Sequence, residues 1–194
     1  MLLNVIDLEA TCWQGSPPPG EVNEIIEIGV CVLDLSSLER VHRRSILVRP
    51  ARSTVSSFCT QLTSLTQEMV DAGTTLADAC SQLRTDLDSP ARPWASWGEY
   101  DRNQFLRQCD QDAVPYPFGE VHLNAKQIYA QAYGLPRRAA GMAQALQHAG
   151  LPLVGRHHRG DDDAWNIAAL ITRLARDGHW PGQPAIRPES PRAT

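Results

Sequence analysis

The sequence lacks paired cysteines, long apolar runs and nearly all lysine. Its cysteines are Cys12, Cys31, Cys59, Cys80 and Cys109. They are odd in number, widely spaced and contain no C-x-x-C pair, so the sequence indicates neither a disulfide framework nor a zinc site. No apolar run is long enough to cross a bilayer, and no basic segment precedes the apolar start. We therefore expect neither a membrane span nor a signal peptide, and we expect a cytoplasmic protein.

Charge decides little about partners. The chain has 18 basic and 22 acidic residues, and Lys126 is its single lysine. A net charge of −4 gives no general attraction to nucleic acid. A nucleic-acid enzyme with acidic metal ligands can still be net acidic, because bound cations neutralise its site locally.

Length and patterning predict one α/β domain over residues 1–178 and an unstructured, proline-rich tail over 179–194. Apolar runs over 2–10, 25–33, 41–48 and 92–97 predict strands, the first three forming an antiparallel meander. Helical spacing is found in segments 58–72, 76–87, 99–109, 124–133, 140–149 and 162–176. This order of elements predicts a mixed sheet with helices packed on both faces.

Two acids stand at the end of the first apolar run. Asp7 and Glu9 are two positions apart, so in a strand they point to the same face and can reach the same cation. Burying a carboxylate without a partner is costly, which favours a cation as that partner. The alternative from these residues alone is a half-exposed strand whose acids face water.

A third acid begins the helix expected at 99–109. Asp101 lies four and eight positions before Phe105 and Cys109, on the same helical face. It is therefore expected to point toward the sheet. The alternative is an acid that is favoured there only by the helix dipole.

The fourth acid comes from a cluster of charged residues before the last helix. Ile167, Leu170, Ile171 and Leu174 follow Asp163 at helical spacing. Asp163 therefore starts the core-facing stripe, while Asp161 and Asp162 are expected to cap the helix. Spacing alone leaves two histidines open, since His158 precedes Asp163 by five positions and His157 precedes Asp162 by five. The helical face favours His158 with Asp163 and leaves His157 paired with a solvent-side Asp162.

Four acids and a histidine from separate segments suit the hydrolysis of a phosphate ester. Two divalent cations about 3.5–4 Å apart need several carboxylates, and they contact both the attacking and the leaving oxygen. A histidine with a pKa near neutrality can accept the proton of the attacking water.

In this order, the motifs VIDLEATC (5–12), SWGEYD (96–101) and HRGDDDAWNIA (158–168) resemble the DEDDh exonucleases of the RNase T/DnaQ-like superfamily. The likeness covers residues 2–176. It is greater for the branch that contains the histone-mRNA 3′-end exonucleases and the KapD-like bacterial proteins. The segments that indicate this branch are EIIEIG (24–29), FCTQLT (58–63) with 67–71, NAK (124–126) and GRHH (155–158).

The resemblance implies a ribonuclease H-like fold with a mixed five-stranded sheet. It implies that Asp7, Glu9, Asp101 and Asp163 ligate two Mg²⁺ or Mn²⁺ ions, and that His158 is the general base, with Glu9 also in the catalytic set. The residues it places near the terminal nucleotide are Ala10, Thr11, Phe58, Leu62, Thr63, Trp97 and His158. For Phe58 and Leu62 the alternative is plain helix core.

The function expected from the resemblance is 3′→5′ exonuclease activity on a single-stranded end, RNA rather than DNA, with release of 5′-nucleoside monophosphates. One rival is a catalytically silent nucleic-acid-binding adaptor of the same fold, although such a protein has no need of four converging carboxylates. Another is a DNA-trimming or proofreading exonuclease, because only contacts to the 2′-hydroxyl separate the two substrates. The sequence leaves any protein partner unidentified.

Overall fold

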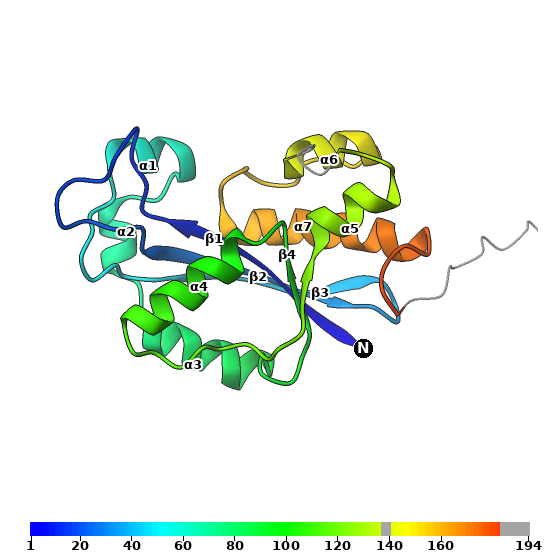
Figure 1. Ribbon diagram of the computed structural model, residues 1–194, viewed down its shortest axis with the longest axis horizontal. Coiled ribbons are helices and arrows are strands. Elements are labelled where there is room, and N and C mark those ends of the chain that lie inside the picture. The colour runs from blue at the N-terminus through cyan, green and yellow to red at the C-terminus, as the bar shows by residue number, and fades with distance from the viewer. Residues whose placement is uncertain (137–140, 183–194) are drawn as a thin grey trace, which may run out of the picture.

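The computed structural model describes residues 1–136 and 141–182, and its centre is a five-stranded mixed sheet (Figure 1). The strands are β1 (Leu2–Ala10), β2 (Ile25–Asp34), β3 (Glu39–Leu47), β4 (Trp94–Ser96) and β5 (His122–Asn124), in the order β3-β2-β1-β4-β5. β1, β2 and β3 pair antiparallel, whereas β4 runs parallel to β1 and β5 parallel to β4. The expected meander and the expected mixed sheet are confirmed. β5 is too short for its periodicity to locate it in the sequence.

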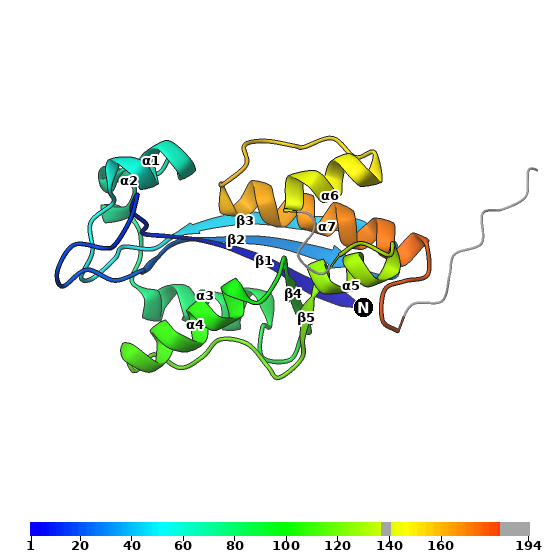
Figure 2. The same ribbon diagram turned by 45° about the horizontal axis from the view of Figure 1, so that its top comes forward.

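Helices cover both faces of this sheet (Figure 2). The helices are α1 (Ser57–Thr63), α2 (Gln67–Asp71), α3 (Leu76–Leu87), α4 (Tyr100–Gln111), α5 (Ala125–Ala132), α6 (Met142–Ala149) and α7 (Gly160–Arg176). One apolar core lies between the sheet and α5, α6 and α7, and a second lies between the sheet and α3 and α4. Nine of the ten β2 residues are buried, as expected for a strand covered on both faces.

The approach of α7 to the sheet depends on two glycines. A Cβ atom on Gly29, in the middle of β2, would overlap backbone atoms of Gly160 and Asp161. A Cβ on Gly160 would in turn lie 2.9 Å from the Gly29 nitrogen and 3.2 Å from the Asp7 oxygen. The helix therefore begins directly against β2 because neither position has a side chain. This contact sets the height of Asp163, one turn further along α7, above the sheet.

The end of the packed chain lies beyond the expected boundary at residue 178. Trp180 is 2% exposed and belongs to the core beneath α5 and α7. Including it in an unstructured tail is wrong, because its indole buries a large apolar area against that core. Residues 183–194 and Ala140, which the sequence assigns to the tail and to a helix, lie outside the described residues. Within residues 1–136 and 141–182, no helix has the length and hydropathy of a membrane span.

Candidate active site

Asp7 and Glu9 lie at the carboxyl end of the central strand β1. In the register with β2, Asp7 is opposite Gly29 and Glu9 is opposite Glu27. Gly29 offers no side chain, so α7 approaches from above and brings Asp163 to the same place. Carboxylate oxygens of Asp7, Glu9 and Asp163 lie within 4.8 Å of one another. The structure thus brings together three of the four acids expected from the sequence in a group that could hold a metal ion.

Asp101 joins the same pocket from the other side of β1. It lies in the first turn of α4, is 5% exposed, and its Oδ1 accepts a 2.9 Å hydrogen bond from the Leu8 backbone N–H. Phe105 and Cys109, expected on the same helical face, are buried in the core below the sheet. The Leu8 bond holds the Asp101 carboxylate beside β1. This hydrogen bond, and not the helix dipole alone, therefore sets the orientation of the Asp101 side chain.

The pocket that these acids share has a volume of about 370 Å³. Its lining residues are Asp7, Leu8, Glu9, Trp97, Tyr100, Asp101, Gly141, Met142, His157, His158 and Asp163. Tyr100, Gly141 and Met142 had no place in the site expected from the sequence. Tyr100 adjoins Asp101 and is 55% exposed, so part of its ring faces solvent while it lines the pocket.

The carboxylates destabilise one another as anions. Burial, followed by repulsion from Asp101, Asp163 and Glu9, raises the pKa of Asp7 well above its ordinary value. Burial and then Asp163 raise the pKa of Glu9 to about 8, and burial raises that of Asp101 to about 6. Divalent cations can neutralise the negative charge of these clustered carboxylates, because hard cations prefer carboxylate oxygens.

One atom indicates directly that the residues fit a metal. Asp163 Oδ1 is buried and has no hydrogen-bond partner within the described residues. Its other oxygen, Oδ2, accepts bonds from both the His157 ring and the His158 backbone N–H. Buried carboxylate oxygens normally have a partner, so the lone Oδ1 is suited to coordinate a cation.

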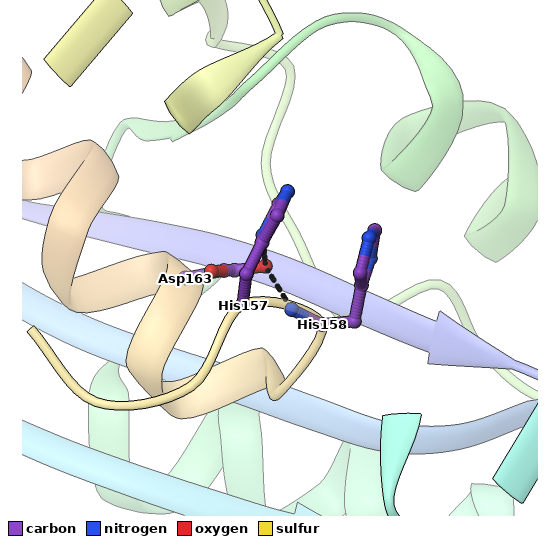
Figure 3. Close-up of side chains that lie close together, drawn as sticks. All are labelled: His157, His158 and Asp163. Atoms are coloured by element: carbon purple, nitrogen blue, oxygen red, sulfur yellow. Dashed lines mark hydrogen bonds and ion pairs between the residues drawn. The ribbon is translucent and has the colours of Figure 1, made fainter. Parts of the chain in front are cut away.

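His157 and His158 stand side by side on the loop before α7 (Figure 3). Their ring centroids are 3.9 Å apart at an interplanar angle of 17°, and His158 adopts φ +65°. Nδ1 of His157 lies 2.8 Å from Asp163 Oδ2, and the His158 N–H donates to the same oxygen at 2.9 Å. Burial and then His157 lower the pKa of His158, while Asp163 opposes them. Both rings line the pocket.

The expected pairing of His157 with a solvent-side Asp162 is wrong. Asp162 accepts a 2.8 Å bond from the Arg156 N–H and forms an ion pair with Arg43 of β3. The carboxylate also fills the space beside Gly155, where a Cβ would overlap it. Asp162 therefore anchors the loop, which leaves both histidines directed to Asp163.

Two buried polar side chains hold the ends of this loop, and neither was identified from the sequence. Asn166 Oδ1 accepts from the Val154 N–H at 3.0 Å, while its Nδ2 donates to the Val154 carbonyl at 2.9 Å. At the other end, Glu27 is fully buried, pairs with Arg159 at 2.9 Å and accepts from the Gly160 N–H at 2.8 Å. An acid inside the otherwise apolar strand 25–33 was the available signal for Glu27.

The residues expected near the nucleotide divide into two groups. Trp97 lines the pocket, but Ala10, Thr11, Phe58, Leu62 and Thr63 are not part of its lining. The hydroxyls of Thr11 and Thr63 bond the Val22 and Cys59 carbonyls inside the fold. Cys59 and Thr63 are the buried residues of α1, so the helix-core alternative for Phe58 and Leu62 does not hold. Phe58 is half-buried, and Leu62 is 36% exposed.

Comparison with known proteins identifies the family. Residues 5–171 match the RNase_T family, described as "Exonuclease". The chain belongs to the RNase_T exonuclease family. Among its relatives, the human 3'-5' exoribonuclease 1 is 33% identical over 183 residues, which cover 90% of this chain and 52% of the relative. The Drosophila melanogaster 3'-5' exonuclease Snipper is 29% identical over 89% of this chain and 69% of its own length.

A solved structure extends this likeness to the fold. The nuclease domain of 3'hExo, described as a DEDDh family member and bound to rAMP, matches with a TM-score of 0.83 and 31% identity. The match covers 91% of this RNase_T-family chain and 92% of that domain. The DEDDh resemblance and the ribonuclease H-like fold class are thereby confirmed. The chain spans about half the length of the human relative. Family membership implies divalent metal ions as cofactors.

Proposed function

We propose that this chain is a metal-dependent 3′→5′ exonuclease that shortens single-stranded RNA and releases 5′-nucleoside monophosphates. Support comes from the names of its relatives and from the likeness to a nuclease domain bound to rAMP. The observation that carries the proposal is the convergence of Asp7, Glu9, Asp101 and Asp163 on one pocket, with Asp163 Oδ1 buried and unpartnered.

In this proposal the four carboxylates hold two divalent cations, Mg²⁺ or Mn²⁺. When bound, two such cations stabilise the charge on the attacking and leaving oxygens of a phosphodiester. The chain orients its carboxylates in advance, because the Leu8 N–H fixes Asp101 and the His158 N–H fixes Asp163. Glu9, two positions after Asp7 on β1, also lines the pocket and belongs to the catalytic set.

We assign the general base to His158. Because burial lowers the pKa of its imidazole, the ring is neutral at neutral pH and can accept the proton of the attacking water. His157 is less suited, since its Nδ1 already faces Asp163 Oδ2 at 2.8 Å. The loop anchors at Val154 and Gly160 keep the His158 ring in the pocket.

We assign the terminal nucleotide to the apolar surfaces of Trp97, Phe58 and Leu62, on which a base can stack. Ala10 directly follows Glu9, and Thr11 and Thr63 use their hydroxyls inside the fold. These three residues are buried, so in this proposal they support the nucleotide site from behind and do not contact the nucleotide. We also propose a cytoplasmic location, a reducing compartment in which the five cysteines would remain thiols.

A silent binding adaptor of the same fold is less favoured. Keeping several carboxylates buried beside one another raises their pKa values and costs folding free energy. A protein that only binds nucleic acid gains nothing from that cost, whereas a metal-dependent hydrolase needs the negative charge.

The test uses 5′-labelled single-stranded RNA and DNA of the same sequence with Mg²⁺ or Mn²⁺. We expect RNA to shorten from its 3′ end, 5′-nucleoside monophosphates to accumulate, and a 3′-phosphate to block the reaction. Asp163→Asn, which keeps the size of the side chain, is expected to be inactive. Cleavage of circular RNA would show an endonuclease, and faster shortening of DNA would favour the trimming or proofreading alternative.

A further inference from the structure

The acids of the pocket are not its only group of metal-ligating atoms. His157, His158 and Asp163 each offer one ligand atom, and these atoms lie within 4.8 Å of one another. Figure 3 shows the two rings rising together from the loop, with the Asp163 carboxylate beside them. Asp163 is common to this group and to the carboxylate group with Asp7 and Glu9. The two groups therefore overlap in one residue.

We infer that His157, His158 and Asp163 form a second metal site, specific for a transition-metal cation of the zinc type, which competes with the carboxylate site for Asp163. Two imidazoles and one carboxylate are a donor set that suits Zn²⁺, whereas Mg²⁺ prefers oxygen ligands and keeps much of its water. Three protein ligands leave one position of a tetrahedral ion open to water.

Binding requires one of the stacked rings to turn, because two nearly parallel imidazoles 3.9 Å apart cannot both direct a nitrogen lone pair at the same ion. Ligands at about 2.0–2.2 Å from a tetrahedral ion are about 3.4 Å apart. Nδ1 of His157 and Oδ2 of Asp163 are now 2.8 Å apart, in hydrogen-bond contact. The His157 side chain is 37% exposed, so its ring can rotate away from Asp163 without disturbing the core. Asp163 also has its buried, unpartnered Oδ1 available for a cation.

The loop that carries both histidines is held before any metal binds. Asn166 fixes it at Val154, Asp162 at the Arg156 N–H, and Glu27 at Arg159 and Gly160. A preorganised site loses less conformational entropy on binding, so three ligands suffice for useful affinity. Sequence position alone would not show this, because Glu27 is more than a hundred residues from the loop.

Occupation of this site removes two groups from the proposed reaction at once. Asp163 would bind Zn²⁺ and would no longer ligate a cation together with Asp7 and Glu9. The His158 ring nitrogen that would accept a proton would also be bound to Zn²⁺. Zn²⁺ is therefore expected to inhibit a reaction supported by Mg²⁺. This inhibition rests on the proposed exonuclease function, whereas binding of Zn²⁺ by the three residues does not.

The binding test is calorimetric titration of the full chain with Zn²⁺ in the absence of Mg²⁺, which would compete for Asp163. The variant is His157→Asn, because its amide can still donate to Asp163 but is a poor zinc ligand. We expect the variant to bind Zn²⁺ at least about tenfold more weakly than wild type. His157→Cys, which restores a zinc ligand, is expected to recover the affinity, and His42→Ala on the exposed part of β3 to match wild type. Equal affinity in wild type and His157→Asn would overturn the site.

The inhibition test measures the zinc concentration that halves the Mg²⁺-supported rate, each variant being compared with its own zinc-free rate. We expect His157→Asn to need at least about tenfold more Zn²⁺ than wild type. Unfolding curves of all variants, recorded in parallel, show that each is folded. If nucleic acid is not cleaved but zinc affinity depends on residue 157, the proposed function fails and the zinc site stands. If RNA is cleaved and zinc inhibits both proteins equally, the zinc site fails and the function stands.

Discussion

Replacing Glu9 by glutamine should stabilise the metal-free protein, by an amount that grows with pH. Glu9 is 8% exposed, and its pKa is raised from 4.5 to about 8 by burial and then by Asp163. Between these values the folded state holds a proton that the unfolded state has already lost. Stability therefore falls as pH rises through this window, and the loss is complete above pH 8.

The size of the effect follows from the two pKa values. At about 1.36 kcal/mol for each pKa unit, the Glu9 carboxyl costs about 2 kcal/mol of folding free energy at pH 6 and about 4 kcal/mol at pH 8. Glutamine has the same size and does not titrate. The advantage of Glu9→Gln over wild type should therefore increase by about 2 kcal/mol between these two pH values.

The assay is urea denaturation of both proteins in excess chelator at pH 6 and pH 8. Glu39→Gln, at an exposed position of β3, is the matched control and should show no such pH dependence. Excess Mg²⁺ should then stabilise wild type at pH 8 more than Glu9→Gln, because a bound cation favours the folded state. A stability difference between the two proteins that does not change from pH 6 to pH 8 would refute the account of the site as a group of mutually repelling acids.

Three further outcomes follow from the site and its supports. His158→Ala should lose about 10²–10⁴-fold in rate while still binding Mn²⁺, whereas His157→Ala should lose much less. Kinetic assays measure the rates and calorimetry measures Mn²⁺ binding. A larger loss of rate in His157→Ala than in His158→Ala would move the general base to His157. Gly29→Ala should be strongly destabilised and bind Mn²⁺ weakly, because its methyl group overlaps Gly160. A wild-type free energy of unfolding together with wild-type Mn²⁺ affinity would contradict this. Trp180→Ala should cost about 3–5 kcal/mol in a denaturation experiment, and an unchanged midpoint would return Trp180 to the tail.

Sequence alone determined most of the helices and strands, though not β5, and the four acids of the pocket. The alternation that places Asp7 and Glu9 on one face of a strand is a local property of the chain. So is the helical spacing from Asp163 to Ile167 and Leu170, both of which are fully buried. Because these periodicities act over a few residues, they can be read without a partner surface. The ordered motifs then sufficed to identify the family and its fold.

Only the tertiary structure decided what surrounds the acids. The contact of Gly29 with Gly160 joins residues far apart in sequence, and steric fit has no local signature. His157 and Asp162 do not pair as expected, because Arg43 on strand β3 binds Asp162 and leaves His157 beside Asp163. Glu27 likewise anchors the histidine loop because the packed fold brings it within reach of Arg159 and the Gly160 N–H. A charged side chain takes the partner that the packed fold brings within reach, and spacing along the chain does not contain that information.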